Sequence, residues 1–283
     1  MKKTVIKIHK AVYSPISDLI TWRAIPSPTI EYLDPFLFLN HHGPQVYGPN
    51  NRGLPFGPHP HRGFETLTFI LSGDISHKDS AHGENVIKAG GIQWMTAGRG
   101  LIHSEVSSQQ FLKEGGKEEV LQLWMNLPSK YKMVDPAYIG LQKEEIPKIE
   151  DTTHKNTLHL ISGNYQAHVG PINALTDLFT STLEIHGGGA FSTDLPENSQ
   201  VFLYLVNGNA TVNNEKVSAR ELVQLSLEGN ELDIVSEDGA LFLYCYGSPF
   251  NEPKVSHGPF VMNTEDEIHE AIRDYQSGKF GHL

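Results

Sequence analysis

The chain has 283 residues, 39% of them hydrophobic and 19% charged, which is the composition of a globular protein with one large or two medium domains. Its formal net charge of -11 argues against a protein that binds nucleic acid directly or binds an anionic membrane. The single cysteine, Cys245, excludes an internal disulfide and lies in an apolar run, so we expect a buried thiol in a reducing compartment. No segment is apolar enough to cross a bilayer and the N-terminus lacks a long apolar stretch, so we expect a cytoplasmic protein, and a monomer.

The first half of the chain is patterned as short β-strands separated by glycine and proline turns. Apolar or alternating segments of strand length occur at residues 3–13, 34–44, 65–71, 75–77, 92–96 and 120–125. A hairpin turn is expected at Gly73, and a Gly/Pro-rich loop at residues 53–58 leads into His59. Because no long helical period interrupts this pattern, the sequence predicts an all-β barrel or sandwich.

The second half repeats this pattern after a polar stretch. Residues 126–151 are rich in Lys, Glu and Pro with weak periodicity, so we expect a linker there. Strand-like runs follow at residues 179–185, 201–206 and 241–246. The chain closes with a predicted helix that begins at a capping box of Thr264 and Glu267 and stops at Gly278. Its apolar stripe, which we expect to cover the outside of a barrel, consists of Ile268, Ala271, Ile272 and Tyr275.

Two pairs of metal-ligand residues share a spacing of two. His59 and His61 form one pair, and His103 and Glu105 form the other. On a β-strand this spacing places both members of a pair on the same face, whereas on a helix they would point in nearly opposite directions. Facing side chains of neighbouring antiparallel strands lie about 4.5–5.5 Å apart, and a metal with bonds of about 2.0–2.2 Å fits between them. Three histidines and one carboxylate therefore predict a mononuclear metal site.

Glu65 is the competing carboxylate. It lies four residues after His61, about 13 Å along a straight strand, so only a bend at Gly63 could bring it to the same ion. Glu105 needs no such distortion. We therefore expect Glu105 to be the fourth ligand and Glu65 to support the site from behind the ligands.

The two halves resemble each other around one glycine turn. When Gly73 is aligned with Gly208, His59 falls on Asp194 and His61 on Pro196, while Ile234 stands near the equivalent of Glu105. The second copy therefore lacks the ligand set. We expect residues 1–134 to form a metal-binding domain, and residues 135–283 to form a second domain without metal that includes the C-terminal helix and tail.

These motifs carry a resemblance to the cupin barrels and, more specifically, to the pirin family. The spacing Gly53-x5-His59-x-His61-x3-Glu65 is similar to the first cupin motif, with Gly73 one residue late as its closing glycine. Gly100-x-x-His103 is similar to the second motif, although Gly98 stands where cupins usually have proline. The segments that resemble pirins are residues 59–66, 77–80, 93–105, 122–128 and 257–264.

The resemblance implies a bicupin, with two tandem cupin barrels (double-stranded β-helices) and one metal in the N-terminal barrel. The family's ligands fall on His59, His61, His103 and Glu105. The resemblance further implies Fe2+ as the metal, but the ligand set alone would also accept Mn, Co, Ni, Cu or Zn, because availability decides between divalent ions. Bacterial pirins resemble quercetin 2,3-dioxygenases, so the expected partners are a small aromatic flavonol and O2.

The same resemblance implies two alternative functions. As a dioxygenase, the protein would bind a flavonol through its 3-hydroxyl, and Glu105 or Glu65 would accept that proton before oxygen attacks the activated ring. As a regulator, the metal would act as a redox-dependent switch and the protein would act through a protein partner, as eukaryotic pirins do in transcription. Turnover of a flavonol separates the two.

The remaining candidate residues have simpler expected roles. His77 and His82 are expected to be surface or structural residues near a hairpin. His41 and His42 are expected at the rim of the pocket and not as ligands. Three further side chains are expected in the barrel core, with the lining of the pocket as the alternative: Gln93, Trp94 and Trp124.

Overall fold

The computed structural model describes residues 1–81 and 83–283. The chain forms two compact units. One unit comprises residues 13–22, 36–144 and 250–283, and we call it the histidine unit because it contains the histidine motifs. The other comprises residues 1–12, 23–35 and 145–249, and we call it the second unit. His82 lies outside the described residues. Within the described chain, no helix is both long and apolar enough to span a membrane.

The histidine unit is built from antiparallel sheets and two helices. Its larger sheet has the order β12-β9-β6-β11-β4-β3-β2, and a four-stranded sheet has the order β5-β10-β7-β8. The larger sheet contains β4 (Phe36–Tyr47), β6 (Phe64–Ser72), β9 (Ile92–Thr96), β11 (Gly116–Asn126) and β12 (Ala137–Leu141). Its last two strands, β2 (Val12–Tyr13) and β3 (Thr21–Ile25), each include residues that are counted with the second unit. The smaller contains β5 (Phe56–His61), β7 (Asp74–Asp79), β8 (Gly83–Lys88) and β10 (Leu101–Val106). Two-residue alternation and glycine turns thus produce the all-β fold that the sequence predicts.

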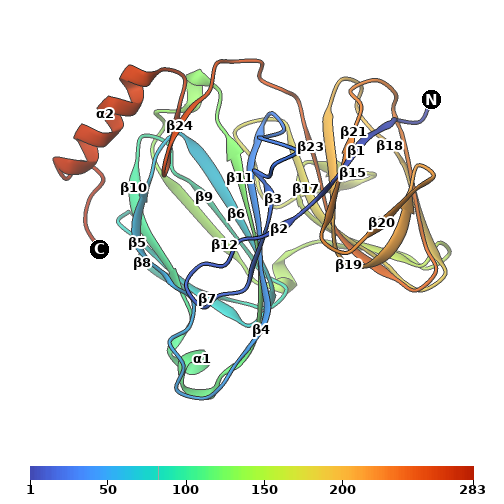
Figure 1. Cartoon of the computed structure of the whole chain (residues 1–283), viewed down its shortest axis with the longest axis horizontal. Helices are drawn as coiled ribbons and strands as arrows, with labels where there is room; N and C mark the ends of the chain where they lie inside the picture. The colour runs from blue at the N-terminus through green and yellow to red at the C-terminus, as the bar shows by residue number, and fades with distance from the viewer. Residues whose placement is uncertain (82) are drawn as a thin grey trace. The chain divides into compact units, whose positions relative to one another are not determined.

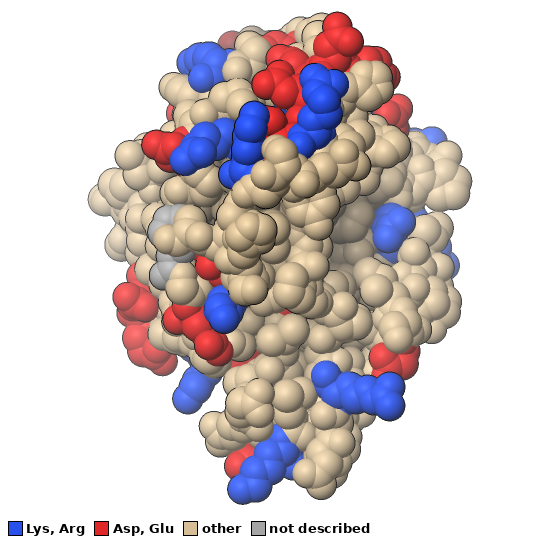
Figure 2. All heavy atoms as spheres, turned by 90° about the vertical axis from the view of Figure 1, so that its left-hand side faces the viewer, with Lys and Arg blue, Asp and Glu red and all other residues tan. Residues whose placement is uncertain are grey.

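The C-terminal segment completes the histidine unit. It forms the hairpin β24 (Val255–His257) and β25 (Phe260–Met262) and the helix α2 (Glu265–Gln276), whose capping box at Thr264 and Glu267 is confirmed. Ile268 and Ala271 pack in one apolar cluster with Phe260 of β25, as expected of a helix that covers a sheet, whereas Tyr275 remains 40% exposed. Helix α2 lies beside β10 and β24 (Figure 1). Charged side chains gather at the height of this helix (Figure 2).

The second unit has one ten-stranded sheet system with the path β1-β21-β19-β23-β17-β14-β13, to which β18, β20 and β22 are joined. Its strands are β1 (Val5–Lys10), β13 (Lys148–Asp151), β14 (Asn156–Ser162), β17 (Leu178–Ile185), β18 (Gly189–Asp194), β19 (Gln200–Val212), β20 (Glu215–Ser218), β21 (Glu221–Leu225), β22 (Glu231–Ser236) and β23 (Ala240–Gly247). A separate hairpin joins β15 (Asn164–Tyr165) and β16 (His168–Val169). Its core is a large cluster of buried aliphatic and aromatic side chains.

The division of the chain differs from the expected boundary between residues 134 and 135. Strand β1 pairs with β21, so residues 1–12 belong to the second unit, and the C-terminal segment 250–283 belongs to the histidine unit. The expected linker at 126–151 contains two short 3-10 turns, η1 (Ser129–Tyr131) and η2 (Lys143–Glu145), and the strands β12 and β13. A short helix that the sequence pattern did not predict, α1 (Gln109–Glu114), follows β10 and is capped by Ser108. Because strand exchange depends on pairing between distant segments, local patterns do not reveal it.

Candidate metal centre

The two pairs of candidate ligand residues lie on neighbouring antiparallel strands, as the sequence predicts. On β5 and β10, His59 lies opposite His103 and His61 lies opposite Leu101. The register shifts between His103 and Glu105, which marks a β-bulge at the site.

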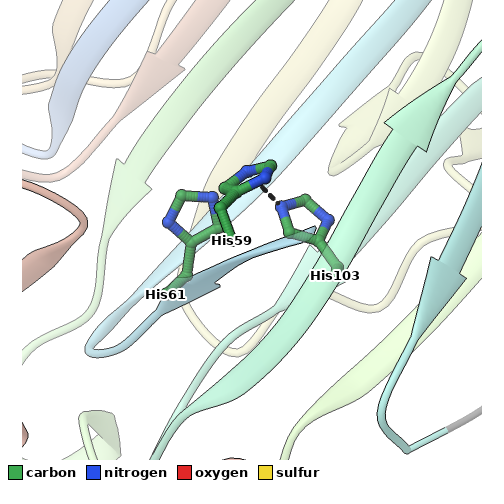
Figure 3. A group of neighbouring side chains, drawn as sticks. All are labelled: His59, His61 and His103. Atoms are coloured by element: carbon green, nitrogen blue, oxygen red, sulfur yellow. Dashed lines mark hydrogen bonds between the residues drawn. The ribbon is translucent and has the colours of Figure 1, made fainter. Parts of the chain in front are cut away.

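Three imidazoles converge between these strands. One ring nitrogen from each of His59, His61 and His103 lies within 4.8 Å of the others, and Nε2 of His59 is 2.9 Å from Nε2 of His103 (Figure 3). His61 and His103 are buried, whereas His59 is half-buried. The carbonyl of Gly57 lies 2.7 Å from Nδ1 of His59, so Nδ1–H donates to it and Nε2 carries the lone pair that faces His103.

The histidines fit the requirements of metal ligands. Burial lowers the pKa of both His61 and His103 well below the usual value, and the neighbouring imidazoles lower it further. Both rings are therefore neutral, the form that binds a metal. Two ligand atoms on one ion, at bonds of about 2.0–2.1 Å and near a right angle, would lie about 3 Å apart. The Nε2 atoms of His59 and His103 have this separation, and a divalent ion fits the donor set.

Glu105 lies next to this cluster and is held by three donors. Its Oε1 accepts hydrogen bonds from Thr68 Oγ1 at 3.0 Å and from Nε2 of Gln93, and its Oε2 accepts one from Nε2 of Gln122 at 2.7 Å. Oε2 is 4.0 Å from Nε2 of His103. The short-range grouping of ligand atoms joins Glu105 with His103 and His77, not with the other two histidines. Direct ligation by Glu105 therefore remains a proposal.

His77 is a site residue that the sequence analysis missed. It was expected at the surface or in a structural role; burial excludes the surface, and its ligand atom lies within 4.8 Å of those of His103 and Glu105. Its Nε2 is 2.9 Å from Oδ2 of Asp79, and its ring stacks on Tyr138 with centroids 3.9 Å apart. The available signal was the spacing of His77 and Asp79, which is the same as that of the predicted ligand pairs.

Glu65 is not part of the site, contrary to expectation. Its Oε1 accepts hydrogen bonds from Nε1 of Trp94 at 3.0 Å and from Oγ1 of Thr96 at 2.6 Å. On β6, Glu65 and Thr68 have opposite parity, and Thr68 is the residue that contacts Glu105. Glu65 therefore points to the face of the sheet opposite the histidines. The turn at Gly63, with φ of 88°, separates β5 from β6 and breaks the parity that the sequence suggested.

The other expected residues divide between the two faces. His41 and His42 were expected at the rim, but both are buried, and His41 Nε2 lies 3.1 Å from Oε1 of Glu119. Gln93 contacts Glu105, as described above, and therefore lines the site. Trp124 also lines it, because its ring centroid is 5.1 Å from that of His61. Trp94 lies on the opposite face with Glu65.

Two β-sheet units, one of which holds a histidine cluster between two antiparallel strands, are typical of a two-domain cupin. The chain matches the pirin family over residues 19–125 and the pirin C-terminal cupin domain over residues 181–281. A Pseudomonas aeruginosa protein provisionally named as a quercetin 2,3-dioxygenase is 33% identical over 266 residues, which cover 94% of this chain and 92% of that protein. Human pirin is 34% identical over 266 residues, which cover 92% of this chain and 87% of that protein. The chain belongs to the pirin family, as its motifs suggest.

Solved structures agree with this assignment. The crystal structure of a quercetin 2,3-dioxygenase from Acinetobacter baumannii has a TM-score of 0.93 at 34% identity and covers 99% of both chains. The bacterial pirin of Escherichia coli, solved in complex with nickel(II), has a TM-score of 0.68 at 20% identity and covers 86% of this chain and 99% of that chain. The latter similarity shows a shared fold.

Proposed function

We propose that the chain is a metal-dependent dioxygenase that opens the central ring of quercetin-like flavonols with O2. The observation that carries this proposal is the convergence of three neutral imidazoles beside a buried carboxylate. The similarity to quercetin 2,3-dioxygenases over nearly the whole chain supports the reaction class. The proposed ligands of one divalent ion, Fe2+ as the first candidate, are His59, His61, His103 and Glu105.

When bound, the metal would lower the pKa of the flavonol 3-hydroxyl and hold the substrate and O2 together. The protein residues then have separate tasks. The hydrogen bond from His59 to Gly57 fixes the ring so that Nε2 faces the centre. Gln93, Thr68 and Gln122 orient the carboxylate of Glu105.

An aromatic wall beside His61 provides the surface for a flat substrate. Phe38 and Trp124 stack with ring centroids 4.5 Å apart, and Phe64 lies 4.6 Å from Trp124. Phe38 and Trp124 are half-buried, so part of their ring surface is accessible to a ligand. We infer that the flavonol ring packs on the wall, which also excludes water from the reacting carbons.

Glu105 is the proposed proton acceptor. Its Oε1 accepts two hydrogen bonds and its Oε2 accepts one, so Oε2 has more accepting capacity left and we assign proton uptake from the 3-hydroxyl to it. The resulting flavonolate carries the electrons that attack O2. Both oxygen atoms enter the ring-opened ester, and one ring carbon leaves as carbon monoxide.

Oxygen uptake and carbon monoxide release with quercetin test this proposal. We expect both in metal-replete wild type, and a large loss of rate in Glu105→Gln. Glu65→Gln is a matched control, because both glutamates are buried but Glu65 faces away from the histidines. If neither oxygen uptake nor carbon monoxide release exceeds the rate of the free metal, with iron, manganese, cobalt, nickel or copper, the enzymatic proposal is wrong. A partner that binds only one oxidation state of the bound iron would then support the regulatory alternative.

A further inference from the structure

The second unit repeats the strand arrangement of the metal centre without its ligands. Strands β18 and β22 pair as β5 and β10 do, and both pairs are antiparallel. In the second unit this pair places Phe191 opposite Ile234 and Thr193 opposite Leu232. Phe191 and Ile234 belong to the buried apolar core. Side chains of the core therefore occupy the space that imidazoles occupy in the histidine unit.

One feature of the metal centre is nevertheless present in both units. In the histidine unit, Phe38 on β4 lies opposite Trp124 on β11, and the rings stack. In the second unit, Phe179 on β17 lies opposite Tyr246 on β23, and these rings stack with centroids 4.5 Å apart and an interplanar angle of 2°. The second unit thus keeps the aromatic wall at the corresponding strand positions.

The wall of the second unit lines a cavity of about 340 Å³. This volume lies in the range of small-molecule sites, which is about 300–1,000 Å³. Tyr246 is half-buried and contributes ring surface to the cavity, whereas Phe179 is buried behind it as part of the core. Polar groups at the cavity come from Asp177, Asn164, Ser199 and Ser248.

The charge of the cavity restricts its ligand. Asp177 contributes an exposed carboxylate, and no lysine or arginine is among the described residues that line the cavity. Burial and the charge of Asp177 raise the pKa of Tyr246 to about 12, so its phenol stays neutral at physiological pH. An anion would meet a carboxylate without a compensating cation, whereas a cation or a neutral donor would meet an acceptor.

We propose that this cavity binds a small planar aromatic molecule, a phenol or an aromatic amine, that is neutral or cationic. The ring would stack on Tyr246, and a donor group of the ligand would reach Asp177. Such a ring contact adds to the stabilisation that burial of apolar area provides. The inference does not rest on the proposed dioxygenase activity, because the cavity lies wholly within the second unit.

Three phenols of different charge test the proposal on the full-length protein as purified. Tyramine is cationic, 4-ethylphenol is neutral and 4-hydroxyphenylacetate is anionic. In two-dimensional amide NMR, we expect tyramine and 4-ethylphenol to shift the resonances of Gly163, Gly247 and Ser248 in a saturable way. The anion should bind at least tenfold more weakly. Absence of saturable shifts with the first two probes, or equal binding of all three, overturns the proposal.

Variants separate the cavity from other binding surfaces. Tyr246→Leu removes the stacking ring and should weaken both bound probes about tenfold. Ser248→Trp, at an exposed lining position, should fill the cavity without a change in the core, so it serves even if Tyr246→Leu lowers stability. Asp177→Asn should weaken the binding of tyramine more than that of 4-ethylphenol.

Tyr13→Leu, at a tyrosine that is 57% exposed and lies in the histidine unit, is the control and should leave binding unchanged. Unaltered binding in both Tyr246→Leu and Ser248→Trp would place the ligand elsewhere and contradict the inference.

Discussion

Nε2 of His59 and Nε2 of His103 lie 2.9 Å apart across the antiparallel pair β5 and β10. Neither nitrogen would approach the other so closely if both rings were charged, and burial keeps the pKa of His103 low. The β-bulge lies beside this contact, because β5 has one more residue between Phe56 and His59 than β10 has between His103 and Glu105. In the second unit, the corresponding pair of β18 and β22 continues without a register shift. We infer that the bulge helps to direct His59 toward His103.

The first prediction concerns metal content. Replacing both His59 and His61 by alanine should reduce bound metal from about one ion per chain to background, because three-point ligation would be lost. The measurement is elemental analysis of protein purified without added metal. Exposed His154→Ala, in the second unit, is the control and should retain its metal. Full metal content in the double variant would rule out the assigned ligands.

The second prediction concerns the amides that hold Glu105. Gln93→Leu and Gln122→Leu each remove a donor to this carboxylate, so we expect metal affinity to fall about 10–100-fold in each variant. Competition with a chelator measures the affinity, and circular dichroism checks the fold. Gln276→Leu, at an exposed position in α2, should bind metal as wild type does. Unchanged affinity in both site variants would mean that Glu105 does not depend on these bonds.

Local sequence patterns predicted much of this structure, and the failures share a physical cause. Local sequence, within a few residues, determines the strands and the capped helix. It also determines that His59 and His61 share one face of their strand. His77 and Glu65 were misplaced because their positions depend on how β7 pairs with β10 and on how the chain turns at Gly63.

The same cause explains the domain boundary and the repeat. Pairing of β1 with β21 joins segments more than 200 residues apart, and no local pattern encodes such a partner. Sequence alignment placed Asp194 at the position of His59. In the structure, His59 lies opposite His103, and Thr193 lies opposite Leu232. With Leu232 as the equivalent of His103, strand pairing therefore makes Thr193 the equivalent of His59.

The third prediction concerns stability against pH. Burial, together with the charge of Asp74, raises the pKa of Glu118 to about 9, although a hydrogen bond from the Asp74 backbone opposes the shift. In the unfolded chain this carboxyl would have a pKa near 4.5, so the folded state holds an extra proton between these values. Its contribution to the free energy of unfolding should therefore decrease as the pH rises from about 4.5 to about 9.

Glu118→Gln removes this titration and tests the sign. Relative to wild type, the variant should gain on the order of a few kcal/mol at pH 8.5 and little at pH 5, as measured by urea unfolding. The exposed Glu114→Gln serves as the control and should show no such dependence on pH. A gain that is equal at both pH values would contradict the assignment.

The last prediction concerns a buried lysine behind the ligand strand. The ammonium of Lys132, which is 1% exposed, donates to the carbonyl oxygen of Gly63 at 2.9 Å, to that of Val261 at 3.0 Å and to Oδ1 of Asn126 at 2.8 Å. It therefore joins the turn after His61 to the C-terminal segment. Lys132→Met would fill the same space but leave three buried acceptors without this donor. We expect a loss of roughly 3 kcal/mol in the free energy of unfolding, together with faster hydrogen exchange at the amide of Val261. Metal affinity should also fall, because Gly63 orients the end of β5.

Exposed Lys130→Met, two residues earlier, is the control and should change none of these quantities. If Lys132→Met lost stability but kept both the metal affinity and slow exchange at Val261, the lysine would support the core without positioning the ligand strand.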